Sequence, residues 1–234
     1  MARRKAYTQN IIATAAALLV WQAAAMALHQ PLLLASPWQV ALRLTTIWRE
    51  AGFFASIFTS FSLIALGFIL GLLVGVLLAI PAARYPLVRV LLKPYVMVIK
   101  SVPVASFVIL ALLWLSSARL STFISFLMVF PVIYNNVLAG ILATDDKLLQ
   151  MARLYQVPFG RRIHMVYLPQ LKPFLLSACS AALGMAWKAG VAAEVIGLPS
   201  GTIGEKLYDA KVYLNTVDLF CWTVLIVLLS VLFE

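Results

Sequence analysis

Long uninterrupted apolar runs dominate this chain and decide what it can fold into. The longest run, 53–80, exceeds the roughly 20 residues that a helix needs to cross the hydrocarbon core of a bilayer. Hydrophobic residues make up 64% of the 234 positions. The runs are continuous rather than alternating, which favours membrane-spanning helices over a β-barrel. The sequence therefore predicts an all-α, polytopic membrane protein.

About six spans fit into the chain. The first run follows a basic start, and no clean cleavage site separates it from a polar segment, so we interpret it as a retained span rather than a signal peptide. An amphipathic stretch with Trp38 and Trp48 precedes the second span, and 81–100 is expected to lie along the membrane interface. The predicted spans, all within one transmembrane domain 1–234, are 11–29, 53–80, 101–117, 121–142, 173–197 and 216–234, with a polar loop at 143–172.

The charge of the chain is distributed unevenly between the two sides of these spans. The formal net charge is +10, which in a soluble protein would suggest nucleic acid as a partner. Here the positive-inside rule explains it better, so no nucleic acid is expected. One side carries Arg3, Arg4, Lys5, the basic residues of 81–100, Lys147, Arg153, Arg161, Arg162 and Lys172; the other carries Arg43, Arg49, Arg119, Lys206 and Lys211. The first side is expected to face the cytoplasm, together with both termini.

The second span carries a ladder of glycines at Gly67, Gly71 and Gly75. Small residues four apart share one helix face and let another helix approach closely. Two interpretations remain open at this point: a contact between subunits and packing within one chain.

The polar segment 150–169, QMARLYQVPFGRRIHMVYLP, lies between two long apolar runs on the predicted cytoplasmic side. A basic, helix-compatible segment in that place is typical of a docking surface for a soluble partner. Asp145 and Asp146 precede it and are candidates for its N-cap and for a favourable interaction with the helix dipole.

The same segment resembles the EAA loop of ATP-binding-cassette (ABC) importer permeases. That motif is E-A-A, three residues, glycine, nine residues, and I-x-L-P. The matching positions are Gln150, Met151, Ala152, Gln156, Val166, Leu168 and Pro169. Two positions depart from the motif: Gln150 replaces the acidic residue and Gln156 replaces the glycine. Pro158 and Gly160 can supply a turn nearby.

Further motifs are similar to the nitrate, sulfonate and taurine group of these permeases, and the resemblance covers roughly residues 30–234. They are LASPWQV at 34–40, Lys100-Ser101-Val102-Pro103, Leu183–Trp187 continuing to Ala193-Glu194, and Ser200–Gly204. The resemblance implies the type I importer permease fold, with 143–172 as the coupling-helix loop that inserts into a groove on the ATPase.

The resemblance also implies partners and a location. These are a second copy of the chain in a homodimer, a pair of ABC ATPase subunits, and a substrate-binding protein, either periplasmic or lipid-anchored, at a bacterial cytoplasmic membrane. The sequence agrees on one point, because it has no G-x-x-x-x-G-K-[ST] phosphate-binding loop. We therefore expect that the chain is not an enzyme, that it needs no cofactor, and that the partner ATPase binds and hydrolyses ATP.

Charged and polar residues inside spans are candidates for the translocation path, because burying them in a bilayer is costly. Lys188 lies deep in the fifth span, with Trp187 beside it and Glu194 nearer the outer end. Lys100 marks the start of the third span, and Asn135 lies in the fourth. Lys188 can attract an anion in the path or pair with a carbonyl or an acid inside the bundle. Glu194 can have a gating role or bond to the backbone of the following loop. Lys100 can line the path or extend its ammonium group to the membrane interface.

No catalytic or metal site is expected. His164 stands alone without other ligands at suitable spacing, and Cys179 and Cys221 fall inside apolar runs as buried thiols. The predicted function is thus the path for a small solute, such as a sulfonate, taurine or nitrate. The alternatives are import of a vitamin precursor such as a thiamine pyrimidine, a secondary transporter, for which internal repeats are missing, and a membrane enzyme.

Overall fold

The computed structural model describes the main chain of residues 2–28, 30 and 32–233 and the side chains of residues 12–28, 30 and 32–232. Two ends of predicted spans, His29 and Glu234, lie outside the described residues, as do the side chains of Arg3, Arg4 and Lys5. All regular elements in the described part are helical, which confirms the predicted fold class. They are α1 (Ala2–Leu28), α2 (Pro37–Leu44), the 3₁₀ turn η1 (Ile47–Arg49), α3 (Phe53–Arg84), α4 (Pro86–Ser101), α5 (Val104–Ala111), α6 (Ser117–Leu142), α7 (Asp146–Leu154), α8 (Phe159–Arg162), the π-helical turn η2 (Ile163–Tyr167), α9 (Leu168–Gly197), α10 (Ile203–Val212) and α11 (Thr216–Phe233).

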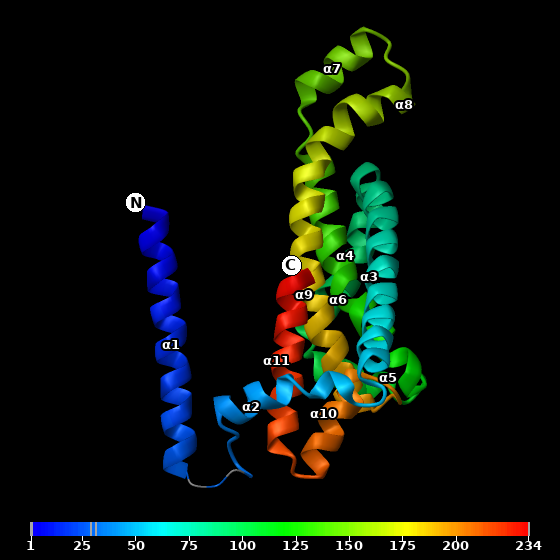
Figure 1. Cartoon of the computed structure of the whole chain (residues 1–234). Helices are drawn as coiled ribbons and strands as arrows, with labels where there is room; N and C mark the ends of the chain where they lie inside the picture. Colours follow the sequence, from blue (N-terminus) through cyan, green and yellow to red (C-terminus); the bar gives the residue numbers. More distant parts are fainter. Residues whose placement is uncertain (1, 29, 31, 234) are drawn as a thin grey trace.

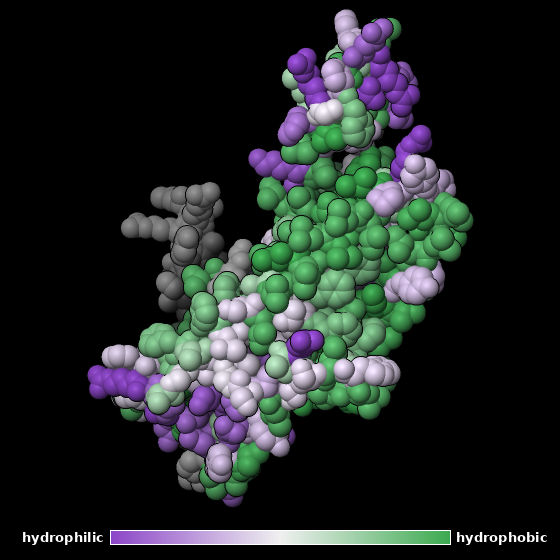
Figure 2. All heavy atoms as spheres, turned by 90° about the vertical axis from the view of Figure 1, so that its right-hand side faces the viewer, coloured by the Kyte–Doolittle hydropathy of each residue, from purple (hydrophilic) through white to green (hydrophobic). Residues whose placement is uncertain are grey.

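Three stretches of the described chain are long and apolar enough to cross a membrane: α3, α6 and the continuous helical stretch Phe159–Gly197. The pair α4 and α5 passes the same test as one broken span, and Ile12–Leu28 and Thr216–Leu232 are shorter apolar helices. Three or four spans of the described chain thus meet the criteria of length and composition, and the two shorter apolar helices bring the total to the predicted six. On the face drawn in Figure 2, an apolar band lies between a polar hairpin at one end and polar residues at the other.

The glycine ladder of α3 packs against α6 of the same chain. A Cβ atom at Gly67 would lie 2.3 Å from the carbonyl oxygen of Thr122, and one at Gly71 would lie 2.7 Å from Cβ of Val129. At Gly75 the nearest atom, in Ile133, would be 2.9 Å away. These distances leave no room for a side chain, so the structure decides between the two interpretations: the ladder serves packing within the chain.

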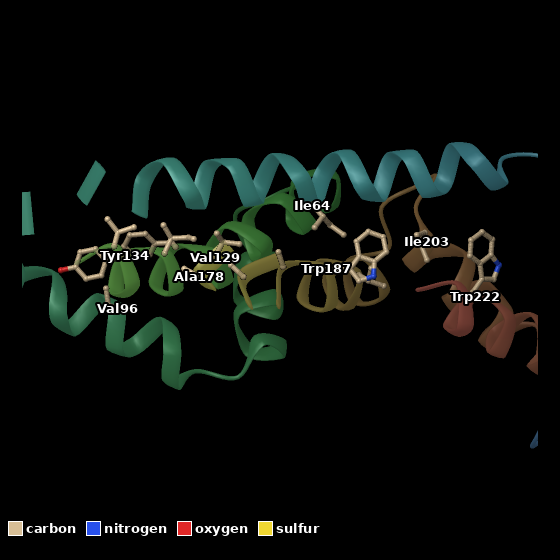
Figure 3. Packing of buried hydrophobic residues seen from close by; sticks show 14 of the residues in the cluster. Ile64, Val96, Val129, Tyr134, Ala178, Trp187, Ile203 and Trp222 are labelled. Atoms are coloured by element: carbon tan, nitrogen blue, oxygen red, sulfur yellow. The ribbon is translucent and has the colours of Figure 1, made fainter. Parts of the chain in front are cut away.

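Helix α9 completes the core by packing against α6 and α3 (Figure 3). Hydroxyl groups of α6 bond to main-chain oxygens of its neighbours. Ser121 Oγ donates to Gly190 O at 3.3 Å, Ser125 Oγ to Ala186 O at 3.2 Å, and Thr122 Oγ1 to Leu63 O at 2.9 Å. Polar bonds of this kind join helices that the hydrophobic effect alone does not hold together in a lipid environment.

The segment 81–117 folds differently from the prediction of an interfacial helix followed by a span at 101–117. Helix α4 packs against α3 and α6, and Val96 is buried there. The chain then bends by 102° into the short helix α5 and ends in turns before α6. Pro103 is the physical cause, because the residue before a proline avoids the helical region. Val102 is accordingly extended, with φ −79° and ψ 131°.

The charged residues of α2, α7, α8 and α10 lie at the two ends of the bundle. The hairpin of α7 and α8 lies at one end, and α2, α5 and α10 lie at the other (Figure 1). Lys147 and Arg161 therefore lie opposite Lys206, as predicted. Lys100 differs from that prediction, because it lies about 21 Å along α4 from Pro86, at 1.5 Å per residue.

The end opposite the hairpin is closed by ionic contacts. Arg43 of α2 forms an ion pair with Glu50, and its Nη2 donates to Asp218 Oδ2 of α11 at 3.1 Å. The hydrogen bond with Asp218 raises the pKa of Arg43 above its ordinary value, so the guanidinium stays charged. This contact fixes the short helix α2 against the start of α11.

Candidate functional site

The polar loop forms a helical hairpin that projects beyond the bundle (Figure 1). Helix α7 begins at Asp145, whose Oδ1 accepts from Lys147 N at 2.8 Å, which confirms the predicted N-cap. The Asp145 amide in turn donates to Gln170 Oε1 at 3.0 Å, so the start of α7 is tied to the start of α9. Asp146 lies in the first turn of α7, where a negative charge favours the helix dipole.

The turn of the hairpin is built on Gln156, which has φ +49°. Gln156 N donates to Arg153 O at 3.0 Å and Val157 N to Ala152 O at 2.9 Å. This pair of bonds is the Schellman motif, which ends a helix with one residue in the left-handed region. The glycine of the resembling motif stands at this position, and the backbone explains why: glycine adopts a positive φ without strain.

The motif residues divide into a buried and an exposed set. Ala152 and Val166 are buried, and they hold the hairpin together from within. Gln150, Met151, Gly160, Leu168 and Pro169 are exposed. Arg162 Nη2 donates to Val157 O at 3.2 Å, which joins α8 to the turn.

Sequence analysis missed the residues that dominate the tip of the hairpin. Leu154 is 80% exposed, Tyr155 73% and Phe159 71%. They flank the Gln156 turn on both sides. A signal was present in the sequence, because three large apolar residues within six positions are unusual in a polar, basic segment. These residues are not part of the EAA motif, which was the basis of the prediction. An exposed apolar surface at a projecting tip is typical of an interaction site.

Two of the predicted path residues serve the packing of the bundle. Trp187 is buried, and its Nε1 donates to Ile226 O of α11 at 3.1 Å. Glu194 is fully buried, and its Oε2 accepts from Ser60 Oγ at 2.7 Å and from Gly204 N at 3.3 Å. Glu194 therefore connects α9 to α3 and to the first turn of α10.

Lys188 lies on the exposed face of α9, between buried Trp187 and Ala189. It lines neither the cavity between α4 and α6 nor the one between α3 and α6. The structure thus separates Lys188 from Lys100 and Asn135.

Lys100 and Asn135 come together in a cavity of about 560 Å³ between α4 and α6. Sequence analysis missed Arg89, Lys93 and Tyr134 as further members of its wall. The positions 89, 93, 96 and 100 are spaced as one helix face, which was a usable signal. It was overlooked because 81–100 was interpreted as an interfacial helix.

A bundle of apolar helices with a polar hairpin projecting from one end defines a class of protein: a multi-pass membrane protein with a helical hairpin exposed beyond its bundle. Over residues 71–233 the chain matches the family described as the inner membrane component of binding-protein-dependent transport systems, and it belongs to that family. The family predicted from the EAA-type loop is thereby confirmed.

Two of the relatives described here are similar over nearly the whole chain, and a third over about two thirds of it. The putative aliphatic sulfonates transport permease of Bacillus subtilis is 27% identical, over 93% of this chain and 79% of the relative. The taurine transport system permease of Escherichia coli is 27% identical, over 95% and 84%. The nitrate import permease of Synechococcus elongatus is also 27% identical, over 66% of this chain and 55% of the relative.

Proposed function

We propose that this chain, as a homodimer, forms the translocation path of an ATP-driven importer for a small anion at a bacterial cytoplasmic membrane. A substrate-binding protein delivers the solute on one side, and a pair of ABC ATPase subunits drives transport from the other. The relatives support the substrate class, because sulfonates, taurine and nitrate all present a charged or strongly polar oxygen group.

The observation that carries this proposal is the apolar tip of the projecting hairpin. Leu154, Tyr155 and Phe159 expose most of their surface beyond the bundle. Exposure of three such side chains is unfavourable in water, and a partner that covers them removes the cost. The basic residues around them suit a partner surface that carries acidic groups.

The helical connection of the hairpin to the bundle supports its role in coupling. Helices α8 and α9 and the π-helical turn between them follow one another without a break from Phe159 to Gly197. A displacement of the tip is therefore transmitted to α9, which packs against α6 and α3. ATP binding that closes the ATPase pair would bias the bundle between inward-open and outward-open arrangements in this way.

The orientation follows from the charge distribution. The hairpin end carries Lys147, Arg153, Arg161 and Arg162, which the positive-inside rule assigns to the cytoplasm. Both termini share that side if all six candidate spans cross the membrane. The ATPase then meets the hairpin, and the binding protein meets the end formed by α2 and α10.

The test is co-purification of the permease with a candidate ATPase, followed by ATP hydrolysis with and without substrate-loaded binding protein. Replacing a central aromatic anchor of an interface costs about 2 kcal/mol or more, so Phe159→Glu should lower the recovered ATPase by more than about tenfold. Tyr213→Glu is the matched control, because Tyr213 is at least as exposed as Phe159 but lies after α10 at the opposite end.

Two results would contradict the proposal. Full recovery of the ATPase with Phe159→Glu would place the docking surface elsewhere. Failure of the unaltered chain to assemble with any ATPase, with uptake persisting, would favour a secondary transporter.

A further inference from the structure

We propose that the cavity between α4 and α6 binds a small oxyanion in transit, such as a sulfonate or nitrate. The inference rests on the proposed function, since it names the place where the transported anion is held. The cavity is lined by three cations of α4 and by Tyr134 and Asn135 of α6.

The three cations form a ladder on one face of α4. Arg89, Lys93 and Lys100 are four and seven residues apart, and at 100° per residue their directions differ by only about 40°. The ladder extends about 16 Å along the helix axis. It begins near the end of α4 that follows α3 and continues along the bundle toward the bend at Pro103.

No carboxylate neutralises these cations in the described part of the chain. The ion pairs found there involve only Arg43, at the opposite end of the bundle. Arg89 Nε donates to Ala82 O at 3.3 Å, which holds the guanidinium in place but leaves its charge unbalanced. Three like charges along one wall repel each other, and an anion between them relieves that repulsion.

The opposite wall supplies hydrogen-bond donors. Tyr134 is only 3% exposed, and its hydroxyl group has no partner among the described residues. A buried hydroxyl without a partner is costly unless a ligand satisfies it. Tyr134 lies beside Val96 of α4 (Figure 3), and Asn135 adds an amide to the same cavity. Cations on one side and neutral donors on the other suit an oxyanion with several acceptor oxygens.

The length of the ladder favours a mobile anion over a lipid headgroup. A headgroup phosphate stays at the membrane interface and would meet only the Arg89 end. Lys100 lies about 16 Å further along α4, where a headgroup would have to enter the apolar band. Lys93 and Lys100 are exposed and flexible, which suits weak binding and rapid release rather than storage.

The experiment measures anion binding to the full-length permease alone, in nanodiscs of phosphatidylcholine, without ATPase or binding protein. The probe is trifluoromethanesulfonate, observed by broadening of its fluorine NMR signal and displaced by methanesulfonate or nitrate. The double variant Lys93→Gln/Lys100→Gln should bind about tenfold more weakly, from the loss of two partly exposed ion pairs. Lys206→Gln/Lys211→Gln, which removes the same charge from α10, should bind as the unaltered chain does.

Tyr134→Phe is a second variant, which removes only the unpartnered hydroxyl and keeps the shape of the core. It should weaken binding by a few-fold while thermal stability without anion stays the same or rises, whereas a purely structural tyrosine would show no effect on the probe. Tyr134→Phe also tests the proposal if the Lys93→Gln/Lys100→Gln variant does not fold.

Unchanged binding in both variants would overturn the proposal. A signal that phosphatidylglycerol in the nanodiscs abolishes, and that methanesulfonate cannot displace, would also overturn it in favour of a lipid site. Because no ATPase is present, a failure here is distinguishable from failure of the importer proposal, which is judged by assembly and stimulated ATP hydrolysis.

Discussion

At position 156 the chain has glutamine where the EAA motif has glycine, yet the backbone keeps the conformation of the turn. Gln156 has φ +49° and closes α7 with the two hydrogen bonds of a Schellman motif. A residue with a Cβ in this region costs about 1–2 kcal/mol relative to its right-handed conformation. The hairpin therefore carries strain at its tip that glycine would remove.

Gln156→Gly should stabilise the turn by about 1 kcal/mol, because it removes the steric cost of a positive φ. The expected result is about fivefold slower hydrogen exchange of the Val157 amide in the purified permease. Gln156→Ala is the control, since alanine keeps the Cβ and should give no such slowing. Equal exchange in the glycine and alanine variants would show that φ at residue 156 is not strained.

Gly67 is the tightest contact of the glycine ladder. Gly67→Ala would place a methyl group 2.3 Å from Thr122 O and 2.8 Å from Ser125 Cβ. Overpacking of this kind costs about 1–3 kcal/mol and should lower the apparent melting temperature by roughly 5 °C. Thermal unfolding in detergent, followed by size-exclusion chromatography, measures it.

The control for that variant is Gly160→Ala. A Cβ at Gly160 meets nothing within 4 Å, and its φ is not positive. Its melting temperature should stay unchanged. A loss of stability in Gly160→Ala equal to that in Gly67→Ala would refute the packing role of the ladder.

At the scale of elements, the start of α10 is joined to α3 and α9 through the hydroxyl group of Ser60. Ser60 Oγ donates to Glu194 Oε2 and accepts from Ile203 N at 2.9 Å, so three helices meet at this atom. The N-terminus of α10 is further closed by Thr202, whose hydroxyl accepts from Glu205 N. The network explains why Glu194 is buried at the end of an apolar helix.

Ser60→Ala should loosen the start of α10. It leaves the Ile203 amide without a partner and removes one donor to Glu194, at a cost of about 1–3 kcal/mol. Hydrogen exchange of the Ile203 and Gly204 amides should become at least about fivefold faster. Ser62→Ala is the matched control, since Ser62 Oγ donates only to Phe58 O within α3. Equally faster amide exchange in Ser60→Ala and Ser62→Ala would contradict the role of Ser60 in holding the start of α10.

At the scale of the molecule, we expect the two polar ends to face opposite sides of the membrane. With Cys179 and Cys221 replaced by alanine, Tyr155→Cys and Tyr213→Cys each offer one exposed thiol. An impermeant maleimide should label Tyr213→Cys in intact spheroplasts and Tyr155→Cys only after lysis. The physical reason is the excess of basic residues at the hairpin end. Labelling in the reverse pattern would invert the topology and remove the ATPase from the hairpin.

Several features could be predicted from sequence because they depend on local chemistry. Apolar runs longer than a bilayer core predict spanning helices wherever they occur. Asp145 predicted the start of α7, since a cap needs only its own side chain and the next few amides. The resemblance of 150–169 to the EAA loop predicted two short helices, which the structure has as α7 and α8, and the basic residues of the loop predicted its place at one end of the bundle.

Other features depended on contacts between residues far apart in the chain. The glycine ladder predicted a close approach but not its partner, because many helices offer a suitable face; only the packing of α3 against α6 decided it. The direction of α4 was missed, because an amphipathic helix with three basic residues suits both a membrane interface and a polar cavity.

The sequence by itself thus determined a helical membrane protein of the transport family, with a polar helical hairpin between two of its spans. Tertiary structure alone decided that Lys100 and Asn135 share a cavity while Lys188 stands apart, and that Glu194 holds α10 in place. The physical reason is that side-chain type and spacing determine which face a helix presents. Which residues that face contacts depends on how all the helices of the bundle pack together. In this protein, the packing of α4 and α6 places the unpartnered Tyr134 hydroxyl opposite three cations.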